Sequence, residues 1–353
     1  MNTYKIAVLK GDGIGPEIVD EAINVLNAVG HKYNIEFDYN EGLVGGIAID
    51  TVGDPFPAET QAICEASDAI LFGAIGDPKF DNNPNAKVRP EQGLLKMRKT
   101  LGLFANIRPV KAYDSLLQLS PLKEQITKGS NFVVIRELTG GIYFGEPRGR
   151  SENGETAFDT CVYTREEIVR VAKMAFEYAK TRRNKLTVVD KANVLATSRL
   201  WRETVQSMEQ NYPSVEVDYM FVDNAAMKLI QQPSYFDVVL TENMFGDILT
   251  DEASVITGSL GMLPSASKGS KVALYEPIHG SFPQAKGKGI ANPIATILSA
   301  AMMLEDLGEV AAAKAIYQSI DNVVNENYLT VDLNPVNPVS TAEVGRRIVE
   351  YIK

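Results

Sequence analysis

Histidine is scarce in this chain of 353 residues, which contains only His31 and His279. A Ser-His-Asp triad or a multi-histidine metal site would need one or both of them, and neither lies near a nucleophile elbow. Cysteine also occurs only twice, as Cys64 and Cys161, which leaves no zinc-ligand spacing and no disulfide framework. These shortages argue against a triad hydrolase and predict two reduced structural thiols.

A long apolar run and an excess of basic charge are absent as well. The longest apolar tract, residues 290–304, contains Asn292 and Pro293 and is too short to span a bilayer. Because no apolar signal segment precedes the first predicted strand, we expect a cytoplasmic protein. The net charge of -10 argues against nucleic acid or an anionic membrane as the main partner, since either favours a basic patch.

The residues that are present indicate a globular α/β protein with two domains. Hydrophobic residues make up 45% and charged residues 23% of the chain, and its length exceeds that of one simple core. A helix is predicted from Thr164, where Thr164 and Glu167 form a capping box, and another is expected to end at Gly30. Short apolar runs alternate with such helical patterns, and they predict strands within the segments 4–9, 69–74, 131–137, 185–191, 215–223, 236–243 and 271–277.

The segment 11–17, GDGIGPE, follows the first of these runs and opens a predicted helix. A strand, a glycine turn and a helix N-terminus together form an anion cradle, which suggests a dinucleotide-binding loop. The usual fingerprint requires glycine at its first, third and sixth positions, but Pro16 occupies the sixth. We therefore predict that this is not a standard Rossmann loop and that the cofactor site lies elsewhere.

Acidic side chains offer a candidate metal site. Asp247 and Asp251 are four residues apart and would project from one face of a helix, where like charges repel each other. A divalent hard cation would reverse that cost, because Mg²⁺ or Mn²⁺ takes one or two carboxylates together with substrate oxygens and water. Asp223, which follows a predicted strand, is a candidate third ligand. The alternatives are a solvated acidic face for the pair and a helix N-cap for Asp223.

Arginines and a branched apolar face offer a candidate substrate site. In the segment 89–98, helical spacing places Glu91, Leu94, Leu95 and Arg98 on one face, which would fit a carboxylate with a small branched alkyl group. Arg108 and Arg136 lie at predicted strand ends, where sites in α/β sheets usually form, and together they could hold a dicarboxylate. Core packing of the leucines and surface ion pairs of the arginines are the alternatives.

Two further residues are candidates for proton transfer. Lys191 comes directly after a predicted strand, and a lysine in a partly dry, cationic pocket has its pKa lowered enough to act as a base. Tyr143 lies in a glycine-flanked turn and could donate a proton, although a packing role is the alternative.

Eight motifs in order closely resemble the isocitrate/isopropylmalate dehydrogenase family of β-decarboxylating dehydrogenases, and within it most closely the branch that acts on 3-isopropylmalate. They run from the first strand to the final helices, so the resemblance covers essentially the whole chain. The motifs are GDGIGPE (11–17), RPEQGLLKMR (89–98), ANIRPV (105–110), RELTGGIYFGEPRG (136–149), VDKANVL (189–195), FGDILTDEAS (245–254), GSLGMLPSAS (258–267) and EPIHGSFPQAKGKGIANP (276–293).

The resemblance implies an α/β fold of the isopropylmalate dehydrogenase type rather than a Rossmann fold. It implies a discontinuous cofactor-binding domain at 1–103 and 254–353, and a central substrate, metal and dimerisation domain at 104–253. It also implies a homodimer with shared active sites, in which Lys191, Val194 and Asp223 reach the site of the partner subunit.

The resemblance further assigns the candidate residues to roles. The carboxylates of the substrate would be held by Arg98, Arg108 and Arg136, and its isopropyl group by Leu94, Leu95 and Val194. Asp223, Asp247 and Asp251 would bind Mg²⁺ or Mn²⁺, with Asp223 also near the substrate, while Lys191 and Tyr143 would move protons. The implied cofactor residues for NAD are Ile14, Glu91, His279, Gly280, Ser281, Gln284 and Asn292.

The implied reaction is oxidative decarboxylation of 3-isopropylmalate to 4-methyl-2-oxopentanoate, in leucine biosynthesis, with reduction of NAD. One residue departs from the family pattern, because Gln284 replaces the acidic residue that usually accepts hydrogen bonds from the adenosine ribose. Gln284 would not repel a 2′-phosphate, so discrimination against NADP is in question. Phe282 and Ala285 differ from the common residues as well.

Two other interpretations stay open. Isocitrate, homoisocitrate and D-malate or tartrate dehydrogenases share the arginines, the aspartates, Lys191 and Tyr143. The face with Leu94 and Leu95 disfavours a tricarboxylate, whose third carboxylate would be unpaired there. A non-catalytic binder of metal-carboxylate ligands is a second alternative, which the presence of both Lys191 and Tyr143 disfavours.

Overall fold

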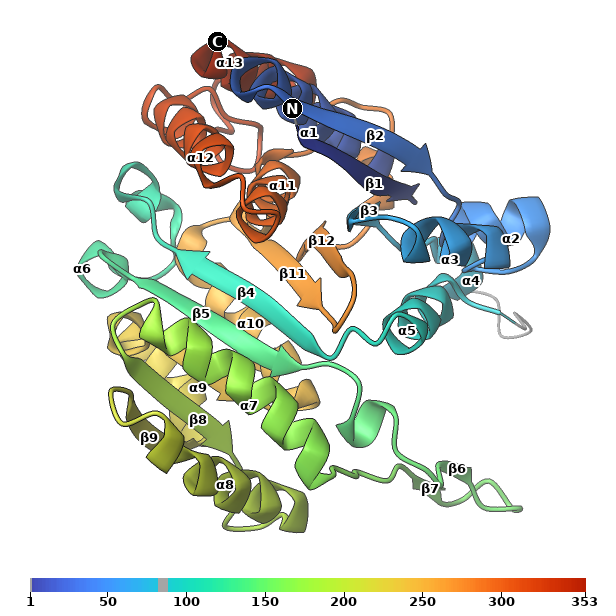
Figure 1. Ribbon diagram of the computed structural model, residues 1–353, viewed down its shortest axis with the longest axis vertical. Coiled ribbons are helices and arrows are strands. Elements are labelled where there is room, and N and C mark those ends of the chain that lie inside the picture. Colours follow the sequence, from blue (N-terminus) through green and yellow to red (C-terminus); the bar gives the residue numbers. More distant parts are fainter. Residues whose placement is uncertain (1, 82–87) are drawn as a thin grey trace. The chain divides into compact units, whose positions relative to one another are not determined.

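The protein has an α/β fold, as the alternating pattern predicts, and its computed structural model describes residues 2–81 and 88–353 (Figure 1). Two compact units divide the chain. The first consists of Met1–Leu103 and Gly258–Lys353, and the second of Phe104–Thr257. The first unit is therefore assembled from two distant segments, and the second from one continuous segment.

The first unit contains a mainly parallel sheet in the order β2-β1-β3-β12-β11. Only the pair β11 and β12 is antiparallel. Ile6 to Leu9 in β1 are all buried, because helices cover both faces of a parallel sheet. The strands are β1 (Asn2–Gly11), β2 (Ile35–Glu41), β3 (Ala69–Ala74), β11 (Pro264–Lys268) and β12 (Ala273–Pro277).

Eight helices of the first unit lie within the described residues. One face of the sheet carries α1 and α11, with α13 and α12 packed against them. On the other face, Cys64 and Met97 bring α3 and α5 into a core cluster with Leu9 and Phe72. The helices are α1 (Gly15–Tyr33), α2 (Gly46–Val52), α3 (Ala58–Glu65), α4 (Pro78–Asp81), α5 (Pro90–Thr100), α11 (Ile294–Asp306), α12 (Val310–Asn325) and α13 (Thr341–Ile352).

The expected end of the first helix at Gly30 is wrong. Helix α1 continues to Tyr33, and Asn34 ends it in the left-handed conformation with φ 58°. Gly30 lies inside the helix, where a β-carbon would come within 2.8 Å of the Ile35 carbonyl oxygen. The glycine therefore serves close packing of α1 against the start of β2 rather than helix termination.

The second unit contains a sheet in the order β4-β5-β10-β8-β9, in which only β4 and β5 are antiparallel. Figure 1 shows α7 and α8 on one face of this sheet and α9 and α10 on the other. A separate short hairpin, β6 (Gly149–Arg150) with β7 (Ala157–Phe158), follows β5. The other strands are β4 (Ala105–Lys111), β5 (Asn131–Glu137), β8 (Lys185–Asp190), β9 (Glu216–Phe221) and β10 (Val238–Thr241).

The capping box predicted for the helix after Thr164 is confirmed. The Thr164 hydroxyl accepts a hydrogen bond from the Glu167 backbone N–H, and the Glu167 carboxylate accepts one from the Thr164 backbone N–H. The helices of this unit are α6 (Glu124–Thr127), α7 (Arg165–Lys180), α8 (Ala196–Met208), α9 (Val222–Gln231) and α10 (Asn243–Ser254).

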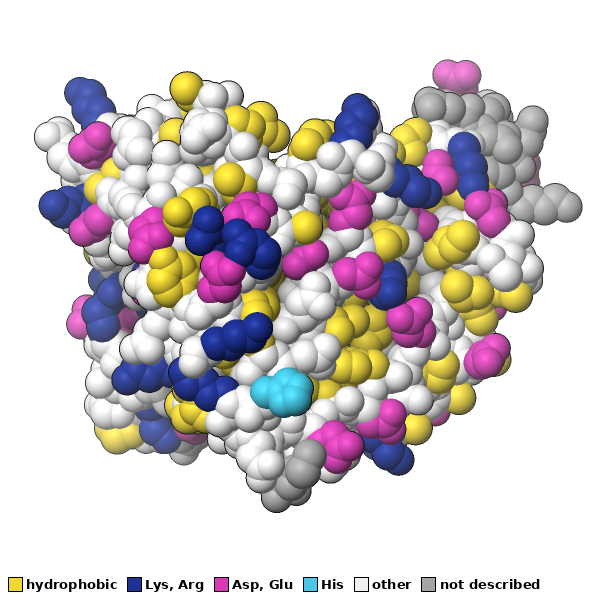
Figure 2. Space-filling model, turned by 90° about the horizontal axis from the view of Figure 1, so that it is seen from above, with side chains coloured by type: hydrophobic (Ala, Val, Ile, Leu, Met, Phe, Trp, Pro, Cys, Tyr) yellow, Lys and Arg dark blue, Asp and Glu magenta, His cyan; other side chains and the backbone are white. Residues whose placement is uncertain are grey.

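The apolar tract around residues 290–304 forms a buried core helix, because every residue from Ile294 to Leu304 in α11 is buried. Within the described part of the chain, no helix has both the length and the apolarity needed to cross a membrane. Cys64 and Cys161 are both free thiols, as predicted. On the face drawn in Figure 2, acidic and basic side chains are interspersed rather than gathered into a region of one sign.

Candidate functional site

Helix α10 is the platform of a polar site in the second unit. Asn243, Asp247, Thr250 and Asp251 follow one another at helical spacings, and each lies near an arginine from β4 or β5. Gly246 allows this approach, because a β-carbon there would come within 2.7 Å of the Arg136 side chain. The sequence pattern at 245–254 thus places acids and hydrogen-bonding groups on the helix face that meets the strands.

Arg136, at the end of β5, is held on this platform from two sides. Its Nε and a terminal nitrogen donate to Asn243 Oδ1 at 3.1 and 2.7 Å, and its other terminal nitrogen pairs with Asp247. Tyr143 donates its hydroxyl proton to the second oxygen of Asp247 at 2.8 Å. Asp247 therefore links the predicted substrate arginine to the predicted proton donor.

The expectation that Arg108 lies at a strand end is wrong, because Arg108 is the central residue of the neighbouring strand β4, where it is anchored in a similar way. Its guanidinium bonds to Asn106 and Thr250, each at 2.5 Å, and one nitrogen lies 3.9 Å from Asp251. Arg108 is 7% exposed and Arg136 3% exposed, whereas the Asp251 side chain is 72% exposed. Two buried cations therefore lie beneath carboxylates that remain open to solvent.

The electrostatics of this cluster favour an ionised Asp247 beside a neutral Tyr143. Burial opposes ionisation of Asp247, but Arg136, the Tyr143 hydroxyl and Arg108 outweigh it and lower the pKa of that carboxyl. Burial, together with the neighbouring Asp247 charge, raises the pKa of Tyr143. Tyr143 thus keeps its proton at neutral pH and can act as a donor.

Lys191 and Asp223 form an ion pair with each other in the second unit. Lys191 follows β8 directly, and Asp223 lies in the first turn of α9. The hydrogen bond from Lys191 lowers the pKa of Asp223, which keeps that carboxylate ionised. Val194, in the same turn as Lys191, is 62% exposed, so this corner presents charged and apolar groups to the outside.

Within residues 2–81 and 88–353, no group of three or more His, Cys, Asp or Glu side chains is arranged to hold a metal ion. Within one chain, helix α10 carries the predicted ligands Asp247 and Asp251. The third predicted ligand, Asp223, does not join them and is paired with Lys191. Two carboxylates on adjacent turns still match the donor set of Mg²⁺ or Mn²⁺, which needs one or two such groups when a substrate completes the shell.

Helix α5 in the first unit carries the predicted apolar face. Leu94 packs against the core cluster of this unit, Leu95 is 37% exposed, and Glu91 is exposed. Arg98 is largely buried and lies 3.4 Å from Glu276, while its Nε is buried without a hydrogen-bond partner among the described residues. A buried guanidinium nitrogen that lacks a partner is suited to receive a ligand carboxylate.

The glycines of the GDGIGPE segment are required by three close backbone contacts in the first unit. A β-carbon at Gly11, Gly13 or Gly15 would meet a carbonyl oxygen at 2.0, 1.9 and 2.0 Å respectively. Gly13 contacts the Ser281 carbonyl, and the Ile14 backbone N–H donates to the same oxygen at 2.9 Å. The segment therefore supports the loop around Ser281 directly.

A cavity of about 360 Å³ lies beside this loop, within the first unit. Four of the predicted cofactor residues line it, namely Ile14, His279, Gly280 and Asn292. Ser281 is adjacent and buried, Gln284 is exposed, and Glu91 does not line the cavity. Burial lowers the pKa of His279, so its ring is neutral at physiological pH.

The walls of the cavity are apolar, with a few convergent polar groups. Leu260, Phe282, Ile290 and Val331 all line it and are all at least 37% exposed. Asp332 supplies a carboxylate that accepts hydrogen bonds from Ser259, Thr330 and Asn292. An apolar cavity that is also lined by a carboxylate and an amide fits a nucleoside, which needs both kinds of contact.

Three acidic residues of the first unit were missed by the sequence predictions. Asp332 lines the cavity, and Glu17 of the GDGIGPE segment accepts from the backbone of Gly287 at 2.5 Å and Gly289 at 3.0 Å. Asp12 is buried and accepts from three backbone N–H groups, those of Gly46, Ile47 and Gly76, at 2.8 to 3.0 Å. Glu17 and Asp12 both lie in the GDGIGPE segment that was already identified, whereas Asp332 lies outside every motif.

Comparison with known proteins matches residues 5–348 to the family model for isocitrate/isopropylmalate dehydrogenase. Among curated relatives, 3-isopropylmalate dehydrogenase of Aquifex aeolicus is 55% identical over 358 residues, covering 100% of this chain and 98% of the relative. The 3-isopropylmalate dehydrogenase of Bacteroides fragilis is 56% identical and covers 99% of each chain.

Solved structures also match the chain over nearly its whole length, at lower sequence identity. Isocitrate dehydrogenase from Methylococcus capsulatus superposes with a TM-score of 0.89 at 35% identity and covers 99% of both chains. A β-decarboxylating dehydrogenase from Thermococcus kodakarensis superposes with a TM-score of 0.81 at 37% identity, covering 99% of this chain and 96% of that one.

Proposed function

Because the chain belongs to the isocitrate/isopropylmalate dehydrogenase family, we propose that it oxidises and decarboxylates 3-isopropylmalate to 4-methyl-2-oxopentanoate in leucine biosynthesis. The observation that carries this proposal is the α10 platform, where two buried arginines meet two carboxylates and a neutral tyrosine. The full-length relatives at 55% and 56% identity bear the name of this activity and support the choice of substrate.

Arg98, Arg108 and Arg136 bind the two carboxylates of the malate. Arg108 and Arg136 are fixed by Asn106, Thr250 and Asn243, so little side-chain entropy is lost on binding. Arg98 contributes the guanidinium nitrogen that lacks a hydrogen-bond partner among the described residues. Three arginines provide enough guanidinium donors for a ligand with two carboxylates rather than one.

The isopropyl group is received by Leu94 and Leu95 of α5 and by Val194 of the partner subunit, with Glu91 nearby. The exposure of Leu95 and Val194, 37% and 62%, supports a role in contact with another molecule. A hydroxyl or amide that could solvate a third carboxylate is absent from these side chains, which disfavours isocitrate.

Asp247 and Asp251 hold Mg²⁺ or Mn²⁺, and Asp223 of the second subunit completes the protein ligands and borders the substrate. A bound nicotinamide supplies the oxidant for the C2 alcohol, and a bound divalent ion supplies charge that stabilises the electrons left when the β-carboxylate departs. Lys191, from the partner, takes the hydroxyl proton, either directly or through a water. Tyr143 gives a proton to the product carbon, and its raised pKa keeps that proton available.

His279, Gly280, Ser281 and Asn292 would hold the adenosine half of NAD at the cavity of the first unit, which Ile14 also lines, and Ile14 and Glu91 would lie toward its nicotinamide end. The apolar walls and the Asp332 carboxylate support this assignment. Gln284 is exposed, two residues after the cavity-lining Phe282, and would hydrogen-bond a ribose hydroxyl without repelling a 2′-phosphate. Any preference for NAD over NADP would therefore come from the shape of the site around the ribose, because Gln284 carries no charge.

A homodimer completes the site, because one chain holds Lys191 and Asp223 together as a pair apart from the ligands on α10. The exposed apolar residues Met227 on α9 and Ile248 on α10, at 53% and 59%, support burial of these helices against a second copy.

The test is a panel of 3-isopropylmalate, isocitrate and D-malate, each with NAD or NADP and with or without chelator, followed through reduced nicotinamide. We expect 3-isopropylmalate with NAD to react fastest and chelator to abolish the reaction. Faster turnover of isocitrate would overturn the substrate assignment. A preference of about tenfold or more for NADP, equal to about 1.4 kcal/mol, would overturn the role given to Gln284.

A further inference from the structure

Asp190 and Arg202 form a partly buried ion pair at the carboxyl end of β8. Arg202 lies on α8, and its Nε and a terminal nitrogen donate to the two oxygens of Asp190 at 2.8 and 2.9 Å. The Asp190 side chain is only 1% exposed. A bidentate arginine fork fixes both partners in direction as well as distance. Neither residue belongs to the machinery assigned above.

This pair contacts the chain segment that carries Lys191 and also the separate segment that carries Asp223. Asp190 precedes Lys191, and its carboxylate also accepts from the Ala192 backbone N–H at 2.9 Å, which fixes the turn around the lysine. Asp190 lies opposite Phe221 in the register of β8 and β9, and Phe221 is two residues before Asp223. One carboxylate therefore holds the backbone on each side of Lys191.

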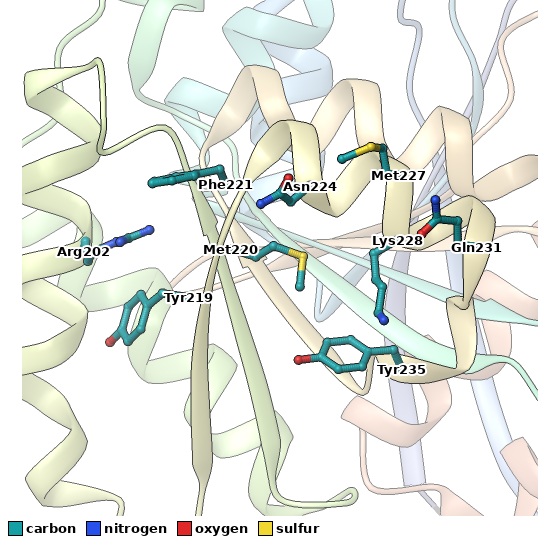
Figure 3. A pocket seen from close by; sticks show the side chains of 9 residues that line it. All are labelled: Arg202, Tyr219, Met220, Phe221, Asn224, Met227, Lys228, Gln231 and Tyr235. Carbon is teal, nitrogen blue, oxygen red and sulfur yellow. The ribbon is translucent and has the colours of Figure 1, made fainter.

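The guanidinium extends this support to the second segment. The Arg202 guanidinium carbon lies 5.1 Å from the centre of the Phe221 ring and 5.3 Å from that of Tyr219, and the Lys191 Nζ lies 6.0 Å from the Phe221 ring. Figure 3 shows Arg202 with Tyr219 on one side of β9, while Met220, Lys228 and Tyr235 lie on the other side. The residues labelled in Figure 3 line a cavity of about 510 Å³, so solvent reaches this edge of the sheet.

We propose that the Asp190–Arg202 pair is a positioning device for the reaction: it sets the distance and orientation of Lys191 and Asp223 relative to each other. The inference rests on the proposed function, in which these two residues act in the site of the partner subunit. Because β9 is the last strand of this sheet among the described residues, the arginine bridge from α8 supports its last residues in place of a neighbouring strand. A displacement of about 1 Å in such a group can cost on the order of a hundredfold in rate.

The same unit contains a second pair of matched chemistry, which serves as a control. Arg182 donates its Nε to Asp237 at 2.8 Å, and the Asp237 side chain is fully buried. This pair lies where β8 and β10 begin, at the end of the sheet opposite Lys191. It therefore shares the burial and charge of the Asp190–Arg202 pair but has no contact with the proposed catalytic residues.

The experiment compares Arg202→Lys and Asp190→Asn with Arg182→Lys in the intact homodimer. We expect the first two variants to lower kcat at least tenfold with little change in KM for NAD, and Arg182→Lys to lower the Tm with kcat retained. The double variant Asp190→Asn/Arg202→Lys is expected to lose no more activity than the worse single variant, because the pair acts as a unit.

A second measurement does not depend on turnover. Mn²⁺ binding to the folded protein raises the Tm, and we expect this rise to be smaller in Arg202→Lys than in Arg182→Lys, because Asp223 is displaced. Equal losses of kcat in the Arg202 and Arg182 variants, with equal Mn²⁺ shifts, would overturn the positioning role. Failure of the positioning role can be distinguished from failure of the proposed function. In the second case the unaltered protein itself would show no turnover of 3-isopropylmalate.

Discussion

At the scale of single residues, Lys191 is the side chain whose replacement best separates catalysis from folding. It is partly exposed and its described contacts are with Asp223 and the Phe221 ring, so Lys191→Met removes no buried support. We expect kcat to fall on the order of a hundredfold to ten-thousandfold, which is the usual contribution of a general base, while the Tm stays close to that of the unaltered protein. Steady-state kinetics measures the change in kcat, and thermal unfolding measures the change in Tm. A non-catalytic binder would have no turnover before the substitution, and therefore no loss of turnover after it.

Phe282 is a residue whose backbone conformation points to a ligand. It has φ 39°, in the left-handed region that bulky residues avoid, and its side chain is 52% exposed and lines the cavity of about 360 Å³ in the first unit. We expect Phe282→Ala and Phe282→Gly to raise KM for NAD to a similar extent by removing an apolar wall. The glycine variant should be the more stable of the two by about 1 kcal/mol, because glycine adopts positive φ without strain. Urea unfolding of both variants tests this order, and equal KM values for all three proteins would contradict the contact with NAD.

At the scale of elements, Gly30 in α1 gives a test in which two effects predict opposite signs. Helix propensity alone predicts that alanine at an interior glycine stabilises the protein by about 1 kcal/mol. The approach of the Ile35 carbonyl to within 2.8 Å of a β-carbon predicts instead a loss of about 1–3 kcal/mol, because backbone has to move. We expect Gly30→Ala to lower the urea midpoint without changing turnover. A higher urea midpoint would show that the backbone of the turn after α1 moves at little energetic cost.

The strands that the sequence predicts are those with continuous apolar runs, such as residues 69–74 and 131–137, which coincide with β3 and β5. Strand β11 was not predicted, because its sequence PSASK lacks any apolar run. Ser265 and Ser267 are nevertheless buried in it, since neighbouring polar groups such as Ser299 and Glu276 satisfy them. Such a strand depends on partners that local sequence does not reveal.

In the candidate site too, residues that belong to a local sequence pattern were predicted, and residues whose role depends on distant partners were not. Asp247, Arg136 and Tyr143 were identified from their motifs, and the structure brings them into hydrogen-bond contact. Asp332 lies outside every motif, and although Asp12 lies inside one, the backbone groups that it binds are 34 to 64 positions away, so neither role was identified. Spacing on one helix is readable from sequence, whereas a carboxylate that joins separate loops is not.

At the scale of the whole molecule, Glu242 is expected to make stability depend on pH. It is 6% exposed, and burial raises its pKa to about 7 from an ordinary value of 4.5. The folded chain thus keeps a proton that the unfolded chain releases, so this contribution is complete below about pH 4.5 and is lost as the pH rises to about 7. Relative to Glu242→Gln, the free energy of unfolding should fall across this window by on the order of 3 kcal/mol, measured by urea titration at several pH values. A difference that does not vary with pH would contradict the raised pKa.

The proposed exchange of residues between subunits also has a measurable consequence for the assembly. Lys191→Met and Asp247→Asn each disable both sites of their own homodimer. In a mixed dimer, one site carries both changes and the other carries none, so random mixing should restore about a quarter of the original activity. Subunit exchange after mild denaturation, followed by a turnover assay, measures the recovery. No recovery despite heterodimers detected by mass spectrometry would contradict shared sites.

The first unit draws its sheet and helices from both Met1–Leu103 and Gly258–Lys353, and α1 packs on α11 and α13. On the ribosome, β1 and α1 emerge early but wait for β12 and the last helices through the synthesis of some 150 intervening residues, while 104–257 already form a continuous unit. Nascent β1 and β3, apolar on both faces, are exposed throughout this delay. Chaperone demand during translation should therefore concentrate on the N-terminal strands, and slower elongation after residue 257 should lower the yield of folded protein.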